Sequence, residues 1–226
     1  SSLESDSSRQ LDAKYAKTTP VVSTAAAFRY DDDVPIIIPG VNEEHLGLLE
    51  YQKKKRGWEG FISPQPNCTT TGMAITLKPI FDDYGIKTVI MTSMQAVSGA
   101  GRSPGVLALD ITDNVIPYIP KEEEKVQIET KKILGKLNSN SIIPANYRVS
   151  CTCTRVNVRE GHTETVFAET ARKAEPEDIV KSMKKYSKRF ASRGLPSAPK
   201  EMITISDDQF RPQPRLDRDN EDGMTT

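Results

Sequence analysis

Alternation between apolar and polar residues marks two long strands in the second half of the chain. Residues 149–158 alternate, and after a short Glu-Gly turn residues 162–168 alternate again. This is the period of two that a strand with one buried face requires, and the two segments predict a hairpin-like pair. Shorter β-branched or apolar runs predict further strands at 21–23, 61–63, 88–93 and 202–205.

Helical spacing of apolar residues predicts the helices that accompany these strands. Within residues 68–84, Met73, Leu77 and Ile80 recur near helical spacing, and an internal proline can bend or end the helix. A second helix opens at Pro176, and its apolar stripe consists of Ile179, Val180, Met183, Tyr186 and Phe190. Two more helices are predicted at 42–56, which ends in a basic run before a glycine, and at 121–137.

Both kinds of element together predict an α+β fold. We expect a mixed β-sheet with helices on one face, the other face being available for self-association. The opening residues are polar and low in large apolar side chains, which predicts a start inside a larger domain. The tail at 211–226 is rich in proline and charge and predicts a surface loop or a linker.

Composition narrows the class of protein further. The chain has 226 residues, enough for one large or two small domains, and 31 basic residues balance 31 acidic ones. A net charge of zero predicts neither a nucleic-acid nor a membrane partner. There is no apolar run of about 18 residues and no secretory signal pattern, and three cysteines do not make a disulfide framework. We therefore predict a cytoplasmic protein with free thiols, small-molecule or protein partners and no metal site.

Cys68 is the first candidate for chemistry, because it stands where a short strand passes into a helix. A thiol at a helix N-terminus meets unpaired backbone N–H groups and the positive end of the helix dipole, which favour the thiolate. The same N–H groups can hold an oxyanion. The alternative is a buried structural cysteine, since free cysteine is among the most buried residue types.

The chain has two histidines. His45 lies early in a charged helix, and we expect it to be solvated. His162 follows a glycine between two alternating segments, where an imidazole can reach into a cleft or be a satisfied structural residue. One cysteine with a distant histidine is a pattern of cysteine nucleophiles, although it is weak alone.

Two interpretations are open for Arg155 and for the acidic start of a predicted helix. Arg155 interrupts a strand of small and apolar residues, so its guanidinium either extends to solvent or pairs with a carboxylate. The acidic helix start KEEEK at 121–125 is either a solvated first turn or part of a site. The glycine-rich turn VSGAG at 97–101 is too short to be a phosphate-binding motif by itself.

Taken in order, five segments resemble the aspartate-semialdehyde dehydrogenase family, in the archaeal and fungal branch that also contains malonyl-CoA reductases. PNCTT is similar to the family's nucleophile segment and QAVSGAG to its glutamine-and-glycine loop. DNVIPYI with KEEEK resembles the entry to its substrate-binding helix, and RV followed by GHTE its arginine-and-histidine segment. SAPK with RPQPRLDRD is similar to its C-terminal signature. The resemblance covers nearly the whole chain.

The resemblance implies a role for each matching residue. Cys68 would be the nucleophile that forms a thioester, His162 the general acid/base and Gln95 an orienting group. The substrate-binding residues would be Asn67, Arg29, Glu122, Lys125 and Arg155. Asn67 would stabilise the oxyanion, and Arg29 and Lys125 would hold a phosphate or similar group. Glu122 would bind the amino group of the substrate and Arg155 its distal carboxylate. Ser98, Gly99, Ala100 and Gly101 would line the nicotinamide side of NADP(H).

The sequence also departs from the family. It contains no Gly-rich dinucleotide-binding motif, and STAAAFR replaces the family's usual Ser-Asn start. We therefore expect a fragment: residues 1–66 as a remnant of the NADP-binding Rossmann domain, 67–210 as a catalytic and oligomerisation domain of the glyceraldehyde-3-phosphate-dehydrogenase-like type, and 211–226 as a loop leading to a missing segment.

Three functions follow from these expectations. The first is an NADP-dependent reductase that converts L-aspartyl-4-phosphate to aspartate semialdehyde, acting as a homodimer or homotetramer. The second is a malonyl-CoA or succinyl-CoA reductase of the same family, with an acyl-CoA in place of the acyl phosphate. The third is an oligomerisation module without activity as a fragment.

Overall fold

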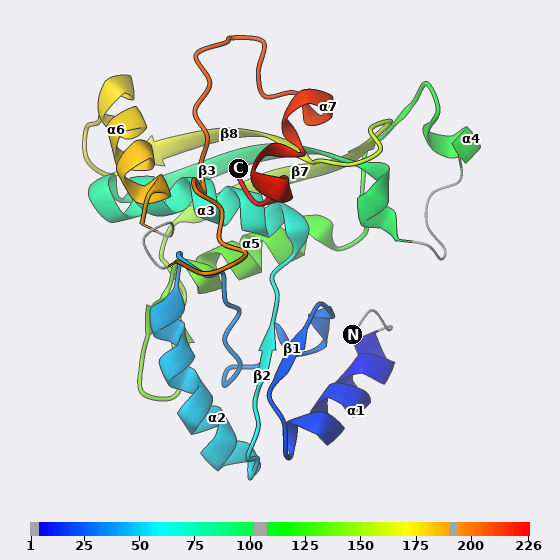
Figure 1. The fold of residues 1–226 in the computed structure, drawn as a ribbon, viewed down its shortest axis with the longest axis vertical. Helices are drawn as coiled ribbons and strands as arrows, with labels where there is room; N and C mark the ends of the chain where they lie inside the picture. Colours follow the sequence, from blue (N-terminus) through cyan, green and yellow to red (C-terminus); the bar gives the residue numbers. More distant parts are fainter. Residues whose placement is uncertain (1–4, 102–107, 190–193) are drawn as a thin grey trace. The chain divides into compact units, whose positions relative to one another are not determined.

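The computed structural model describes residues 5–101, 108–189 and 194–226 (Figure 1). The chain divides into two compact units, one made of segments from 1–74 and 128–146, the other of segments from 75–127 and 147–226. The domain boundaries expected from the resemblance stay a prediction.

The first unit is built around two short parallel strands. Strand β1 (Val21–Ser23) pairs with β2 (Ile62–Pro64), with Val21 opposite Ile62. The unit also contains α1 (Ser5–Ala16), η1 (Ala26–Phe28), η2 (Glu43–Gly47), α2 (Leu48–Arg56) and the antiparallel pair β5 (Lys136–Leu137) and β6 (Ile142–Ile143). Helix α2 ends as the sequence predicts, because Gly57 takes the left-handed conformation (φ 66°) that closes a helix.

The core of this unit is small and apolar. Ala16, Phe28, Val34 and Ile62 are each at most 2% exposed and form one cluster, against which Trp58 packs. Helix α1 contributes Ala16 to this cluster, although the polar opening of the chain gave no sign of a helix. An amphipathic stripe made of alanine and small polar residues carries too little apolar signal to be recognised from periodicity.

The second unit contains the main sheet. In the described part of the chain this sheet has four strands in the order β4-β7-β3-β8. They are β3 (Ile86–Gln95), β4 (Val115–Ile116), β7 (Arg148–Val156) and β8 (Thr163–Thr170). Strand β3 is parallel to β7 and antiparallel to β8, so the sheet is mixed, as predicted.

Strands β7 and β8 do not form the hairpin that their sequences predict. Strand β3 lies between them and pairs with both, with Ser93 opposite Cys153 of β7 and Glu164 of β8. The physical reason is that alternation tells which face of a sheet each residue occupies, but not which strand lies beside it. A ten-residue strand such as β3 would leave a long row of backbone N–H and C=O groups unpaired at a sheet edge, and a place between β7 and β8 pairs both of its edges.

Helices cover one face of this sheet (Figure 1). Helix α3 (Cys68–Tyr84) continues through Pro79, α5 spans Glu122–Ile133, and α6 spans Pro176–Ser187. Within this unit α6 is fixed to the end of α3, because the Ser182 hydroxyl donates to the Pro79 carbonyl at 3.3 Å. Its predicted stripe is confirmed in position for Tyr186, which is buried, whereas Phe190 lies outside the described residues.

The predicted strand at 202–205 is absent from this described segment. The Ile203 amide bonds to the Ser187 hydroxyl at 3.1 Å, while the Thr204 amide bonds to the carbonyl of Thr226 and the Thr226 amide to that of Met202. These backbone amides are therefore hydrogen-bonded to a side chain and to the last residue of the chain, and they do not need a neighbouring strand. The remaining described elements are η3 (Val97–Ala100), α4 (Ala108–Ile111), α7 (Pro214–Asp217) and η5 (Asn220–Gly223).

No helix among the described residues is both long enough and apolar enough to cross a bilayer.

Candidate active site

Strand direction brings several candidate residues to one end of the main sheet. Gln95 is the last residue of β3 and lies opposite Arg155 of the parallel strand β7. Strand β8 runs the other way, so its first residue, Thr163, lies beside Met94 at the same end, and His162 immediately precedes it. The topology therefore gathers Gln95, Arg155 and His162, which are up to 67 positions apart in sequence.

The His162 ring is held by the backbone of the segment that follows β3. Its Nδ1 accepts the Ala96 N–H at 3.1 Å, so a neutral ring carries its proton on Nε2. Burial lowers the pKa of His162, the positive charge of Arg155 lowers it further, and Glu122 opposes this by raising it. The folded protein therefore favours the neutral form of the ring, which carries its proton on Nε2.

Arg155 is buried rather than extended to solvent. The residue is 5% exposed and its Nη1 donates to the Ala96 carbonyl at 2.8 Å, so the solvent-exposed alternative is wrong. The same residue, Ala96, thus orients both the arginine and the histidine. Gly99 leaves room for them, since a Cβ there would lie 2.8 Å from Arg155 Nη1 and 3.1 Å from the His162 ring.

The acidic helix start belongs to this cluster. Glu122, the first residue of α5, is 5% exposed, which excludes the solvated-turn interpretation for this residue. Its carboxylate accepts from the Gln95 amide at 3.3 Å and pairs with Lys125 at 3.3 Å. Gln95 also donates to the Ser93 hydroxyl at 3.2 Å. Five of the predicted residues of this unit are therefore connected by hydrogen bonds or by charge to a neighbour in the set, namely Gln95, Glu122, Lys125, Arg155 and His162.

The predicted cofactor-binding residues form the turn η3 and its end. Its residues 97–100 are not buried. Gly101 has φ 71°, and a Cβ at this position would have open space around it, with no described atom within 4 Å. A glycine-containing turn with accessible backbone beside an imidazole fits the close approach of a flat nicotinamide ring. The residues are compatible with the predicted role.

The first unit holds the predicted nucleophile segment. Cys68 is exposed and is the first residue of α3, so it is not a buried structural cysteine. Asn67 caps the helix: its side-chain oxygen accepts the Thr70 N–H at 3.1 Å and its carbonyl accepts the Thr71 N–H at 2.9 Å. The oxygen of the Asn67 side chain therefore orients the helix start, and an oxyanion would use its Nδ2 end.

Arg29 is buried beside a carboxylate that sequence reasoning missed. Its Nη1 lies 3.2 Å from Glu129, whose side chain is 0% exposed, and its Nη2 donates to the Thr24 carbonyl at 3.0 Å. Glu129 also accepts the Asn67 N–H at 2.7 Å. The only signal for Glu129 in the sequence was a charged residue within a helix that also carries an apolar face, which is common and unspecific.

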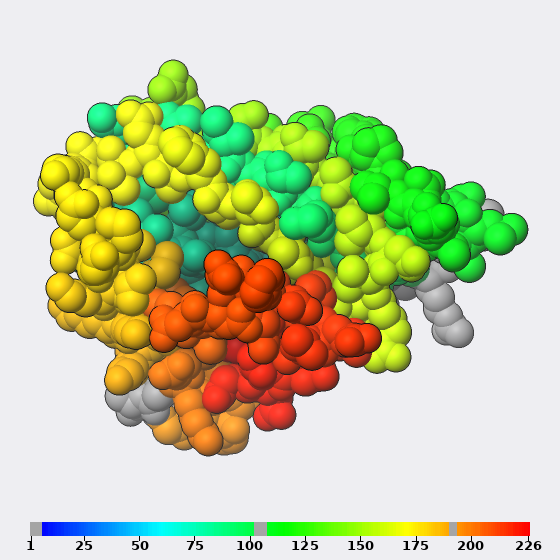
Figure 2. Space-filling view, turned by 90° about the horizontal axis from the view of Figure 1, so that it is seen from above, coloured from blue at the N-terminus to red at the C-terminus, as the bar shows by residue number. Residues whose placement is uncertain are grey.

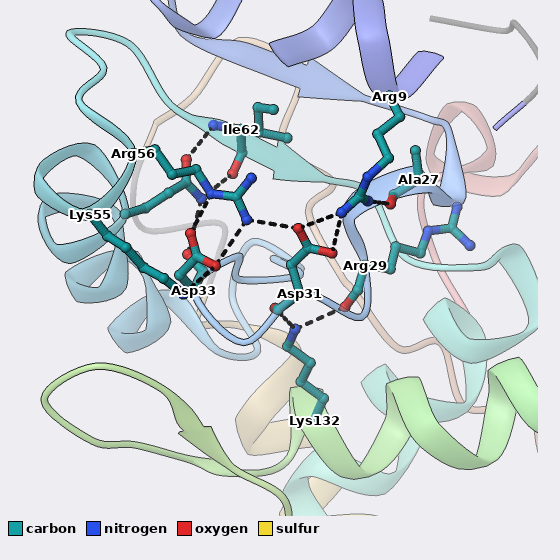
Figure 3. A network of polar contacts seen from close by, with 10 residues as sticks. Arg9, Ala27, Arg29, Asp31, Asp33, Lys55, Arg56, Ile62 and Lys132 are labelled. Carbon is teal, nitrogen blue, oxygen red and sulfur yellow. Dashed lines mark hydrogen bonds and ion pairs between the residues drawn. The ribbon is translucent and has the colours of Figure 1, made fainter. Parts of the chain in front are cut away.

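A second group of charges, the Asp31–Asp33 network, lies in the first unit (Figure 3). Arg56 bonds to both Asp31 and Asp33, and further cations reach the two aspartates from Arg9 and Lys55. Burial alone would raise the pKa of Asp33, but the bonds from Arg56 and Lys55 outweigh it and lower the pKa to about 2. This network pairs its charges internally, as a structural cluster does.

His45 is not solvated, contrary to expectation. It is 0% exposed; its Nδ1 lies 2.9 Å from the Asn42 amide and its Nε2 3.1 Å from the Gly135 carbonyl. A histidine with both ring nitrogens engaged by fixed groups is a structural link. Because its neighbours in the sequence are charged, the sequence did not indicate that one side of this turn is buried.

Three features characterise the fold and its candidate residues. They are a mixed sheet with helices on one face, a histidine–arginine–glutamine cluster at one sheet end, and an exposed cysteine at a helix N-terminus. A family model described as "Semialdehyde dehydrogenase, dimerisation domain" matches residues 77–225. The chain belongs to this family.

Relatives and solved structures agree with this assignment. The chain is 49% identical over its whole length to an aspartate-semialdehyde dehydrogenase of Archaeoglobus fulgidus and 45% identical over 99% of its length to that of Methanothermobacter thermautotrophicus. It spans 64% of the length of each relative. The crystal structure of the Candida albicans enzyme with NADP is similar with a TM-score of 0.85 at 37% identity, over 96% of this chain and 63% of that one.

Proposed function

We propose that this chain supplies the catalytic and dimerisation parts of an NADP-dependent aspartate-semialdehyde dehydrogenase. The observation that carries the proposal is the cluster of Gln95, Glu122, Arg155 and His162 in a chain of this family. Glu122 suits an α-ammonium group and Arg155 suits a carboxylate, which are the two charges of an amino-acid substrate. A malonyl or succinyl group has no ammonium for Glu122 to bind.

In this reaction the Cys68 thiolate attacks the acyl carbon of L-aspartyl-4-phosphate and a C–S bond forms. The C–O bond to phosphate breaks, which releases phosphate and leaves a thioester on Cys68. NADPH, when bound near residues 98–101, supplies the hydride. The resulting oxyanion is stabilised by a hydrogen bond from His162 Nε2, and when its C=O double bond re-forms, the C–S bond breaks, the electron pair returns to Cys68 as thiolate and the aldehyde is released.

The remaining side chains bind and orient. Glu122 would hold the substrate ammonium and Arg155 its carboxylate, while Gln95, fixed by Ser93 and Glu122, would orient the reacting carbonyl. Lys125 and Arg29 are the cations available for the phosphate. For Arg29 this means a guanidinium already oriented by Glu129.

The test is an assay of the full-length protein that contains this chain. We expect robust reduction of aspartyl phosphate with NADPH and little turnover of malonyl-CoA or succinyl-CoA. Turnover of a CoA thioester with none of aspartyl phosphate would contradict the substrate assignment, and no turnover of either would favour an oligomerisation role alone.

We further propose that the protein forms a homodimer through the outer face of its main sheet. Ile90 and Phe167 lie on this face and are 53% and 63% exposed, and Figure 2 views the molecule from this side. Large apolar side chains on one sheet face suit burial against a second copy, and the family description supports this. Sedimentation of full-length protein should give a dimer or a tetramer, and Phe167→Asp should shift it toward monomer. An unshifted variant would contradict the proposed face.

A further inference from the structure

Glu129 makes an unusual set of contacts for a buried carboxylate. Its side chain is 0% exposed. One oxygen, Oε1, accepts from Arg29 Nη1 at 3.2 Å and from the Tyr30 hydroxyl at 3.1 Å. The other, Oε2, accepts the backbone N–H of Asn67 at 2.7 Å. A single side chain therefore joins two segments of the first unit that are 37 residues or more apart in the sequence.

One of these segments begins the nucleophile helix. The Asn67 N–H that Glu129 holds belongs to the residue directly before Cys68. Asn67 in turn caps α3 through its bond from the Thr70 N–H. A shift of the Asn67 backbone would therefore move both the cysteine and the helix N–H groups beside it.

The other segment carries the candidate anion-binding arginine. The Arg29 guanidinium is fixed at two points, by Glu129 and by the Thr24 carbonyl. Its backbone carbonyl accepts from Lys132, which lies one helical turn after Glu129, and Figure 3 shows the Arg29 side chain directed away from this lysine. The last turns of α5 thus hold Arg29 at both its backbone and its side chain.

We propose that Glu129 is a positioning residue that fixes the Cys68 segment and the Arg29 guanidinium relative to each other. Both groups act on the same acyl phosphate in the proposed function, Cys68 at the carbonyl carbon and Arg29 at the departing phosphate. A rigid link between them keeps the attacked carbon and the leaving group in line. The kinetic part of this inference rests on the proposed function.

The test is Glu129→Gln in the full-length enzyme. Glutamine has nearly the same shape but is neutral, so the ion pair with Arg29 is lost, and its single oxygen can accept either from Arg29 and Tyr30 or from the Asn67 N–H, but not from both sides. We expect kcat to fall about 10- to 100-fold. In the reverse direction, in which phosphate attacks the thioester, the KM for inorganic phosphate should rise at least threefold. Amide hydrogen exchange of the peptide that contains Asn67 and Cys68 should accelerate.

The matched control is Glu44→Gln, which removes an exposed carboxylate from the same unit. It should stay within twofold of wild type in kcat, phosphate KM and exchange. A Glu129→Gln enzyme that is folded, with kcat and phosphate KM both within twofold of wild type, would overturn the proposal.

Tyr30→Phe keeps the inference testable if Glu129→Gln does not fold. It removes one hydroxyl donor from Oε1 and leaves the carboxylate in place. We expect a two- to fivefold loss of kcat with a rise in phosphate KM, and unchanged constants would count against the proposal. Exchange needs no turnover: if the wild-type enzyme does not reduce aspartyl phosphate, the proposed function fails, while faster exchange in Glu129→Gln still supports the link.

Discussion

The surroundings of two clusters of charged and polar residues in this protein shift the pKa values of their side chains with opposite effects on charge. In the Asp31–Asp33 network, bonds from Arg56 and Lys55 lower the pKa of Asp33 to about 2 and the same pairing raises the pKa of Arg56. In the cluster at the end of the main sheet, burial and Arg155 lower the pKa of His162. The surroundings of the first cluster therefore favour the charged forms of Asp33 and Arg56, whereas those of the second favour the neutral form of the His162 ring.

This difference distinguishes a structural cluster from the proposed catalytic one. The charges of the Asp31–Asp33 network pair with one another and stabilise the folded state, and the resemblance to the family gives none of them a role in binding. A neutral imidazole with its proton on Nε2 is prepared to donate to an oxyanion. Density of charge alone would have ranked the Asp31–Asp33 network first, whereas the direction of the pKa shifts points to His162.

The largest expected effect comes from the nucleophile. Cys68→Ser in the full-length enzyme should lower kcat by several orders of magnitude, because a hydroxyl is far less ionised than a thiol. The melting temperature should hardly change, since Cys68 is exposed. Cys151→Ser, at a buried cysteine of β7, is the control for loss of a thiol as such. Residual activity above about a tenth for Cys68→Ser would argue against this role.

The next effect tests the neutral histidine. His162→Gln should lower kcat roughly 100- to 1,000-fold, the usual contribution of an acid/base group. Because burial and Arg155 lower its pKa, the ring stays neutral below the ordinary value of 6.5, and wild-type activity should decline only at a pH below that value. The pH profile of His162→Gln should lack that decline, and an unchanged profile would refute the assignment.

The Asp31–Asp33 network should respond in stability rather than in catalysis. Asp33→Asn should cost about 2 kcal/mol in the free energy of unfolding, because the half-buried Arg56 and the exposed Lys55 lose a buried anionic partner. Activity per folded molecule should stay near wild type.

The pH dependence sharpens this prediction. The folded-state pKa of Asp33 is lowered, so its stabilising contribution is complete above about pH 4 and is lost as the pH falls toward 2. Urea titrations between pH 2 and 7 should show this contribution in wild type and not in Asp33→Asn. Asp32→Asn, at the exposed neighbouring aspartate, is the control and should match wild type; a loss equal to that of Asp33→Asn would exclude a specific role for the network.

The smallest expected effect concerns the space beside the histidine. In Gly99→Ala the new Cβ would press on Arg155 and the His162 ring, and a displaced donor should lower kcat about tenfold. Calorimetry should show little change in melting temperature, because Gly99 is not buried. Wild-type kcat in this variant would mean that the ring position is not critical.

Much of the local structure could be predicted from the sequence. The helices at 42–56, 68–84 and from Pro176 have apolar residues at helical spacing, and the long strands alternate, so each signal is contained within its own segment. The candidate residues Cys68, Gln95, Glu122, Arg155 and His162 were found because they occur in ordered motifs that resemble one family. Helix α1 was missed because its buried residues are small or polar.

By itself the sequence determined most of the helices and strands and the family, and it predicted candidate residues for the chemistry. The tertiary structure decided that β3 separates β7 from β8, that His45 is buried, and that Glu129 joins Arg29 to the segment before Cys68. The physical reason is range: periodicity and capping act within a few residues, whereas strand order and the partner of a buried charge depend on groups far apart in the chain. The neutral state of His162 is of the second kind, since burial and the charge of Arg155 exist only in the folded protein.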